Sequence, residues 1–360
     1  MDTITHSLLG ALVVRSAFPA SGSKRPLTNR QRLLTGAIAG AFPDVDYVAS
    51  FVDPMVYLTL WHRSITHSFV MLPLWALLVG VLLSFAFRQR GQWCFLTLLA
   101  GISVISHILS DLITVYGTQI FSPLSGWRAS IGTTFIIDPW FTMIVLIGFI
   151  AGLKENVRLL PQISLAILVA YVTFQGVLKY QALSVAYAHV NNEAMKPDLV
   201  EAFPQPFSPY NWKLLIKAGD RYDTAYINLN NGYTVVDSDT GFWADVKKTY
   251  RASHDLSWKR YHKFGDNPHR AKRIRALWKN PKLDYFRKFA AFPMLYRMDT
   301  TADNTCVWFT DLRYVLPYMT PPFRYGLCQS AGKSDWRLNR LRRFVRKVPW
   351  FHRDPATEVP

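Results

Sequence analysis

The sequence predicts an α-helical membrane bundle of four spanning helices and two short helices, followed by a small soluble α+β domain. The first observation is the distribution of charge. Residues 1–180 hold only 12 Lys and Arg and 7 Asp and Glu, whereas residues 181–360 hold 29 Lys and Arg and 17 Asp and Glu. Apolar run length is the second, because the first half contains four long stretches with almost no charge. We expect a membrane-embedded metal-site domain over 1–180, a soluble domain over 181–332 and a basic amphipathic segment over 333–360.

The apolar runs of the first half define the helices in order. Two short runs, Ile4–Val14 and Leu33–Phe42, predict helices too short to span unaided, which tilt or insert halfway against their neighbours. Four longer runs predict the spans, since about 20 apolar residues in a helix cross a bilayer: Phe69–Phe87, Gly91–Ser110, Pro139–Leu153 and Leu159–Leu178. The run Pro139–Leu153 is short for a span unless its helix begins before Asp138. No signal peptide is expected, because an acid follows Met1 in place of a basic region.

Lysine and arginine in the short loops predict the orientation of the bundle. If every segment turns back, one face receives Lys24, Arg25, Arg30, Arg32, Arg88, Arg90, Lys154 and Arg158, and the other receives Arg63, Arg128 and Lys179. The first face is expected to be cytoplasmic. Six segments then return the chain to the other side, so we expect a multi-pass protein of the bacterial inner membrane with its soluble domain on the exoplasmic side.

Acidic and histidine side chains gather at one predicted end of these segments. They are Asp2, His6, Asp44, Asp46, His62, His67, His107, Asp111 and Asp138. Ionisable residues at membrane depth are costly, so by default they face the interior of a bundle and mark a functional site. Each has a plain structural alternative, because a single histidine is often a core residue and Asp2, Asp46 or Asp138 can cap a helix. The gathering of nine such groups on one face favours a site.

Two of the motifs place their groups on one face of a helix. Asp2 and His6 are four positions apart, and so are His107 and Asp111. Residues four apart in a helix lie one above the other, so each pair presents an imidazole and a carboxylate in the same direction.

The other two motifs lie outside long helices. Asp44 and Asp46, in the Pro-Asp-Val-Asp that starts at Pro43, point the same way if that segment is extended. His62 and His67 are five positions apart and cannot share a helix face. We therefore place His62 in a loop and His67 in the first turn of the next helix.

The donor set predicts a divalent metal centre. Imidazoles and carboxylates without thiolates suit zinc first, with manganese and iron as alternatives, and nine groups allow one ion or two ions bridged by a carboxylate. The candidate metal ligands are Asp2, His6, Asp46, His67, His107 and Asp111. The candidates for a general base, a ligand-orienting group or a substrate clamp are Asp44, His62, Asp138, Arg63 and Arg128. Asp2 is a candidate for the orienting or basic role as well.

At these residues the sequence resembles a family of bacterial inner-membrane proteins described as metal-dependent hydrolases, some of them as LexA-regulated or LexA-binding. The resemblance rests on ordered motifs over about residues 1–180: MDTITHSLLGALVVR, FPDVDY, HRSITHS, SHILSDLITVYGT, FSPLSGWR and IIDPW. The later stretch FPQPFSPYNWK is similar to the soluble tail that many members carry. The resemblance implies a membrane hydrolase whose Asp and His motifs bind metal, and it indicates location and metal dependence more than substrate.

Short alternating runs after about Pro204 predict the strands of the soluble domain. Tyr222–Leu229 and Tyr233–Val236 flank an Asn-Asn-Gly sequence typical of a hairpin turn, and Cys306–Leu316 predicts a further strand. Residues 244–297 mix helix signals with basic clusters. These features indicate a small α+β domain that restricts access to the site or binds substrate headgroups.

Two features of the soluble half leave alternatives open. Cys306 and Cys328 suit a disulfide if the compartment is oxidising, and two unrelated buried thiols fit the sequence equally well. Trp336–Trp350 predicts a basic amphipathic helix, which lies on anionic lipid or packs on its own domain.

The expected partners are membrane lipids and an amphiphilic substrate. The formal net charge of +17 suggests nucleic acid, but the sequence has no zinc-finger, RNA-recognition or helix-turn-helix motif, so we expect no nucleic-acid partner.

The expected function is hydrolysis of a lipid-linked or amphiphilic substrate, phosphoesters included, by a metal-activated water. One alternative is a non-enzymatic membrane scaffold or regulator stabilised by the metal. The other is a metal-independent lipid phosphatase in which the histidine of a His-x-x-x-Asp pair attacks phosphorus. Such phosphatases also need an arginine-rich cradle and a Gly-His motif, which the sequence lacks.

Overall fold

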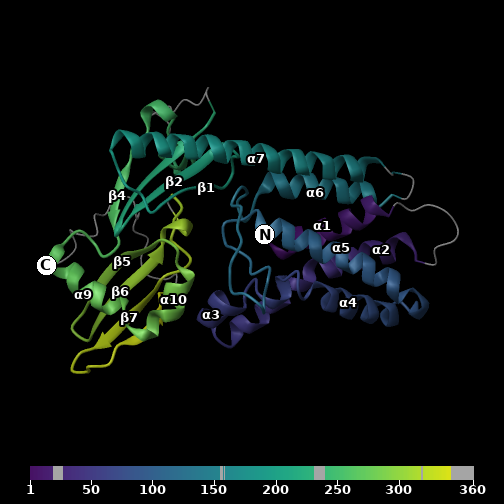
Figure 1. Ribbon diagram of the computed structural model, residues 1–360, viewed down its shortest axis with the longest axis horizontal. Helices are drawn as coiled ribbons and strands as arrows, with labels where there is room; N and C mark the ends of the chain where they lie inside the picture. Colours follow the sequence, from purple (N-terminus) through teal and green to yellow (C-terminus); the bar gives the residue numbers. More distant parts are fainter. Residues whose placement is uncertain (19–26, 155–156, 158, 231–239, 318, 342–360) are drawn as a thin grey trace. The chain divides into compact units, whose positions relative to one another are not determined.

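The computed structural model describes residues 1–18, 27–154, 157, 159–230, 240–317 and 319–341 (Figure 1). The chain divides into two compact units, Met1–Val177 (unit 1) and Leu178–Pro360 (unit 2). Several expected features lie outside the described residues: the basic residues Lys24, Arg25 and Arg158, the strand at Tyr233–Val236, and all of the terminal segment after residue 341.

Unit 1 is helical, as the sequence predicts. Its elements are α1 (Thr3–Ala17), α2 (Asn29–Ala41), η1 (Phe42–Phe51), α3 (Pro54–Val56), η2 (Tyr57–Trp61), η3 (Ile65–His67), α4 (Leu72–Ala86), η4 (Arg90–Gln92), α5 (Trp93–Leu112), α6 (Pro139–Gly152) and the first part of α7 (Leu159–Asn192). Helix α1 contacts α2, α5 and α6, and α4 packs along α5 (Figure 1). Leu83, Leu96 and Val104 belong to one buried apolar cluster, and Leu12 and Phe141 belong to another.

The described residues contain two or three candidate membrane spans in place of the four expected. Arg90–Leu112 and Leu159–Asn192 are long and apolar enough to cross a bilayer, and Pro54–His67 with Leu72–Ala86 qualifies only as a pair bent by 72°. Helix α6 is a shorter apolar helix of 14 residues. Helices of 15 and 14 residues, α4 and α6, are only ~22 Å and ~21 Å long, short of the ~30 Å hydrocarbon core.

The first sheet of unit 2 packs against the second part of α7. Its antiparallel strands, in the order β1-β2-β3-β4, are β1 (Leu199–Pro204), β2 (Asn211–Ala218), β3 (Arg221–Asn228) and β4 (Lys259–His262). Helix α7 buries an apolar stripe whose residues are four positions apart: Leu178, Ala182, Ala186 and Val190. Apolar side chains of the sheet, Trp212 and Ile227 among them, pack against this stripe.

The second sheet of unit 2 is also antiparallel, in the order β5-β6-β7-β8. Its strands are β5 (Pro293–Thr300), β6 (Asn304–Asp311), β7 (Tyr325–Ser330) and β8 (Arg337–Arg340), and the helices of the unit are α8 (Phe242–Thr249), α9 (Pro268–Trp278) and α10 (Asp284–Phe289). Unit 2 is therefore a sheet-containing domain with helices, in agreement with the predicted α+β class. Strand β8 lies where the basic amphipathic helix was expected to begin, so that prediction is wrong for residues 337–340, which pair with β7.

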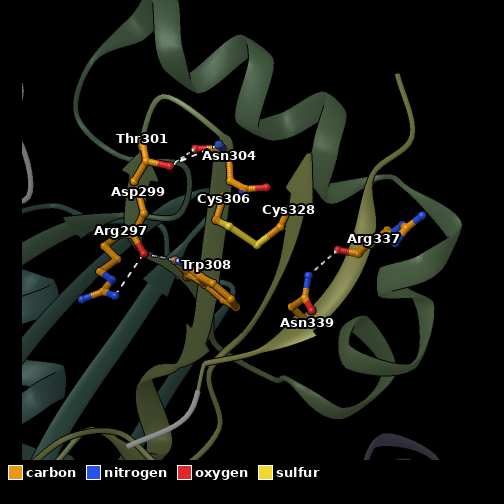
Figure 2. Close-up of a disulfide and its surroundings, with 9 residues drawn as sticks. All are labelled: Arg297, Asp299, Thr301, Asn304, Cys306, Trp308, Cys328, Arg337 and Asn339. Carbon is orange, nitrogen blue, oxygen red and sulfur yellow. Dashed lines mark hydrogen bonds and ion pairs between the residues drawn. A yellow bond between two sulfur atoms is a disulfide. The ribbon is translucent and has the colours of Figure 1, made fainter. Parts of the chain in front are cut away.

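Strand register decides between the two expectations for the soluble cysteines. Cys306 on β6 lies directly opposite Cys328 on β7 and forms a disulfide with it (Figure 2). Beside it, the indole nitrogen of Trp308 donates to Asp299 Oδ2 at 2.7 Å. Cys94, on α5, is an exposed free thiol.

Candidate metal centre

Histidine and aspartate side chains from four separate elements meet inside unit 1. They are His6 on α1, Asp44 and Asp46 on η1, His67 on η3, and His107 and Asp111 on α5. His6, His67, His107 and Asp111 are buried. The rings of His6 and His107 stack with centroids 3.7 Å apart, and that of His67 meets His107 edge-on at 4.8 Å.

A close contact between α1 and α2 brings these elements together. A Cβ on Gly36 would lie 2.6 Å from the carbonyl oxygen of Gly10, and one on Gly40 would lie 2.6 Å from that of His6, so only glycine permits this approach. The Gly36-x-x-x-Gly40 spacing is typical of close helix pairs in membranes, and it is the one signal in the sequence that could have predicted this contact. Because α2 ends beside α1 here, the carbonyl oxygen of Gly40 accepts a hydrogen bond from His107 Nδ1 at 2.6 Å.

Hydrogen bonds orient the three buried imidazoles. A carbonyl oxygen only accepts, so His107 Nδ1 carries a proton. The hydroxyl of Ser110 donates to the His107 carbonyl at 2.9 Å and therefore accepts from His6 Nδ1 at 3.1 Å. His67 Nδ1 lies 3.0 Å from the Thr66 hydroxyl and 3.6 Å from Asp46 Oδ2.

The Nε2 atoms of His67 and His107 lie close together, 3.0 Å apart and within hydrogen-bond distance. Asp111 Oδ2 lies 3.4 Å from the first and 3.5 Å from the second, and Asp44 Oδ1 lies 3.7 Å from both. His6 Nε2 and Asp111 Oδ2 are buried and make no hydrogen bond among the described residues.

These residues fit a divalent cation. Two overlapping groups, His6-Asp44-His107 and His67-His107-Asp111, each have their ligand atoms within 4.8 Å of one another. Each unsatisfied buried polar atom costs about 1–3 kcal/mol, and His6 Nε2 and Asp111 Oδ2 are two such atoms. A cation beside them would relieve this penalty, and imidazole with carboxylate is a donor set for zinc, manganese or iron.

Asp44 and Asp46 occupy positions opposite to those we expected. The segment is a 3₁₀-helix and not extended, so residues two apart point about 120° away from each other. Asp44 approaches the Nε2 edge of His67, and Asp46 approaches the Nδ1 edge of the same ring. Asp44 thus joins the ligand group and Asp46 the groups that orient it. The hydroxyl of Thr3 donates to Asp44 Oδ2 at 2.6 Å, a contact that the sequence did not suggest.

Arg63 links two of the three aspartates of the cluster. Its backbone N–H donates to Asp46 Oδ2 at 3.0 Å, and its guanidinium pairs with Asp111 Oδ1 at 2.8 Å and donates to Thr114. Its φ of 56° is left-handed, a conformation that costs a non-glycine residue about 1–3 kcal/mol. The contacts of Arg63 offset this cost, so the described geometry makes it a positioning residue, and its expected clamp on a substrate stays a prediction.

His62 and Arg128 lie at the outer side of the cluster. His62 Nδ1 is 2.8 Å from the Tyr57 hydroxyl and 3.4 Å from Asp46 Oδ2, and its side chain is 19% exposed. The guanidinium of Arg128 donates to the backbone carbonyls of Thr59, His62 and Gly117, which holds the loop before η3 in place. A role for Arg128 toward a substrate stays a prediction.

Asp2 and Asp138 cap helices, as their structural alternative predicts. Asp2 accepts hydrogen bonds from the backbone and hydroxyl of Thr5 at the start of α1. Asp138 caps α6 and also accepts from Tyr171 and Gln175 of α7. Neither belongs to the two candidate metal groups among the described residues.

Comparisons with known proteins place the helical unit in a family. Residues 1–182 match the family described as YdjM inner membrane protein. Over 142 residues the chain is 28% identical to the "Uncharacterized protein YfhP" of Bacillus subtilis (strain 168), a match that covers 39% of this chain and 42% of that protein. No solved structure matches. With the apolar helices described above, the match supports an inner-membrane location. The match takes in every residue of the metal cluster, and the chain therefore belongs to the YdjM inner membrane protein family.

Proposed function

We propose that this protein is a membrane hydrolase that uses a divalent metal to cleave a lipid-linked or amphiphilic substrate, phosphoesters included. The observation that carries the proposal is the convergence of three imidazoles and two carboxylates in two overlapping candidate metal groups. In this proposal His6, Asp44, His67, His107 and Asp111 hold the metal, and Asp46 orients His67. A divalent ion held there supplies a water molecule acidic enough to act as a nucleophile near neutral pH.

Zinc is the first expectation for the ion, and manganese and iron are the alternatives. Neutral imidazoles with carboxylates suit all three. The two candidate groups share His107, which supports either one ion or a closely spaced pair.

His62 is the proposed proton acceptor. Its Nδ1 faces the hydroxyl of Tyr57 and the carboxylate of Asp46, so Nε2 is left to take a proton from the attacking water. His62 and Asp44 have partly exposed side chains, at 19% and 14%, so solvent and substrate reach the cluster from this side.

Exposed apolar residues on the same segments support an amphiphilic substrate. Phe51, the last residue of η1, and Val52, directly after it, are about four-fifths exposed, and Trp61, directly before His62, is also exposed. Large apolar side chains that stay exposed around a polar site are typical of surfaces that meet lipid or a ligand.

We also propose that unit 2 lies on the exoplasmic side. The disulfide between Cys306 and Cys328 supports an oxidising compartment, and the distribution of Lys and Arg in the loops supports the same orientation. In intact spheroplasts, added protease should then cleave unit 2. Unit 2 that is cleaved only after the membrane is opened would contradict this orientation.

Metal content with a matched histidine control tests the hydrolase proposal. Purified wild-type protein should carry a stoichiometric amount of zinc, manganese or iron by elemental analysis. His107→Ala should lose the metal, whereas His254→Ala, at an exposed histidine of unit 2, should keep it. A panel of lipid and phosphoester substrates is then assayed with and without that metal.

Each other outcome identifies an alternative. Metal-free wild-type protein that hydrolyses the same substrates, insensitive to chelators, would point to a metal-independent lipid phosphatase. Metal that is bound but resists exchange, with no substrate cleaved, would point to a scaffold or regulator, for which the burial of the three histidines is the favouring observation.

A further inference from the structure

Unit 2 concentrates its positive charge in one short part of the chain. Residues 259–288 hold 11 Lys and Arg against 2 Asp and Glu. This excess of 9 is more than half of the excess of 17 in the whole chain, in one-twelfth of its length. The charge excess is therefore a local property of this segment.

Helix α9 presents much of this charge on a fixed surface. Ile274 and Trp278 are buried and attach one side of the helix to unit 2. Besides Arg275, four exposed basic residues lie on the helix or directly after it, and we call them the α9 basic face: Arg270, Lys272, Arg273 and Lys279. The side chain of Asn267 accepts hydrogen bonds from two backbone N–H groups and caps the start of the helix.

The acids nearby bind other basic residues. Asp220 pairs with Arg275 at 2.8 Å, Asp335 with Lys282 at 2.8 Å, and Asp284 with two further cations of α10. Within the described ranges, no ion pair joins an acid to any member of the α9 basic face. Like charges one turn apart on a helix destabilise it by a few tenths of a kcal/mol, so the fold alone gives no reason for this arrangement.

We propose that the α9 basic face binds the headgroups of an anionic phospholipid surface. The positive charge of the α9 basic face is complementary to such a surface. Helix α7 runs without a break from a candidate membrane span into unit 2, so α9 is tethered to a bilayer at high effective concentration. Each Lys or Arg near an anionic surface contributes about fivefold to binding. No Phe, Tyr or Trp of α9 is exposed, which disfavours single-stranded nucleic acid, whose bases stack on such rings. This inference is independent of the proposed hydrolase activity.

Labelling of a single cysteine on α9 measures this contact in the full-length protein. Ala276, exposed on α9, is replaced by Cys in a Cys94→Ser background, and the protein is placed in nanodiscs of phosphatidylglycerol or of phosphatidylcholine. A bulky maleimide should react more slowly with Cys at this position in phosphatidylglycerol discs, because bound headgroups cover the helix. High salt should remove the difference, since exposed charges are screened within a few ångströms at about 1 M.

Two charge-matched double variants assign the effect to α9. K272Q/R273Q should shift the docking equilibrium toward the free state by about thirtyfold, from two residues at about fivefold each. K196Q/K333Q removes the same charge at exposed lysines elsewhere in unit 2 and should leave the difference intact. Equal labelling rates of the wild-type face in the two lipids, an equal effect of both double variants, or protection that appears only with added RNA would each overturn the proposal.

Discussion

Asp44 and Asp46 provide the sharpest test of the metal centre, because they are two residues apart and approach opposite edges of the His67 ring. Asp44→Asn and Asp46→Asn remove the same charge with the same change of shape. From the geometry, Asp44 belongs to the group that would hold the ion and Asp46 orients a ligand. The first variant should therefore weaken metal binding more than the second.

The size of the difference follows from these positions. Loss of a carboxylate that orients a metal-ligating histidine usually weakens metal binding 10–100-fold, or about 1.4–2.8 kcal/mol. Asp46 also accepts the backbone N–H of Arg63 at 3.0 Å, so its variant should fall at the upper end of that range. Among the described residues, only two carboxylates face the Nε2 atoms, and Asp44→Asn removes one of them. This variant should therefore lose more than about 100-fold in metal affinity.

Competition with a chelator of known affinity measures both variants in detergent solution. Thermal unfolding of the metal-free forms serves as the control, since a variant that is merely unstable would lose metal without information about the site. An Asp46→Asn variant that loses more affinity than Asp44→Asn would refute the roles drawn from the 3₁₀-helix. It would restore the roles expected from the sequence, with Asp46 as a ligand and Asp44 as a base or an orienting group.

Two further predictions concern stability. Burial lowers the pKa of Lys213 from 10.5 to about 7, while its Nζ donates to the carbonyls of Leu312 and Val315. Between those values the unfolded chain binds a proton that the folded chain lacks, so the contribution of Lys213 to the free energy of unfolding should rise by about 1.4 kcal/mol per pH unit. Lys213→Met should remove this slope in denaturant titrations at several pH values, and an unchanged slope would contradict the assignment. Gly36→Ala should force α1 and α2 apart at a cost of about 1–3 kcal/mol, measured by thermal unfolding, because its Cβ would lie 2.6 Å from a backbone oxygen. Gly91→Ala, with nothing within 4 Å of its Cβ, is the matched control, and an equal loss in both would argue against the close contact.

Spacing within a helix predicted part of the site well. His107 and Asp111 are four apart on α5, and the structure brings both to the cluster, because a helix fixes the direction of residues one turn apart. The same argument did not hold for Asp2 and His6. Asp2 lies at the helix start, where unsatisfied backbone N–H groups compete for its carboxylate, and it caps α1 instead.

The number of spans was less predictable from apolar runs. A run of apolar residues shows where a helix can lie in lipid, but not where its backbone turns. Helix α4 begins only at Leu72, after a turn, and α6 begins at Pro139 because Asp138 caps it. Both helices are therefore shorter than the apolar runs from which they were predicted.

The sequence by itself determined the class of this protein: a sparsely charged helical half, a basic sheet-containing half, and a set of histidines and aspartates at one end of the helices. These follow from composition and from local periodicity, which each segment carries without its neighbours. The tertiary structure alone decided which groups meet. The close approach of glycines placed Gly40 beside His107, and the turn of η1 directed Asp44 and Asp46 to opposite edges of one ring. Strand register paired Cys306 with its partner cysteine. Contacts between distant segments depend on packing and backbone geometry that no single segment encodes.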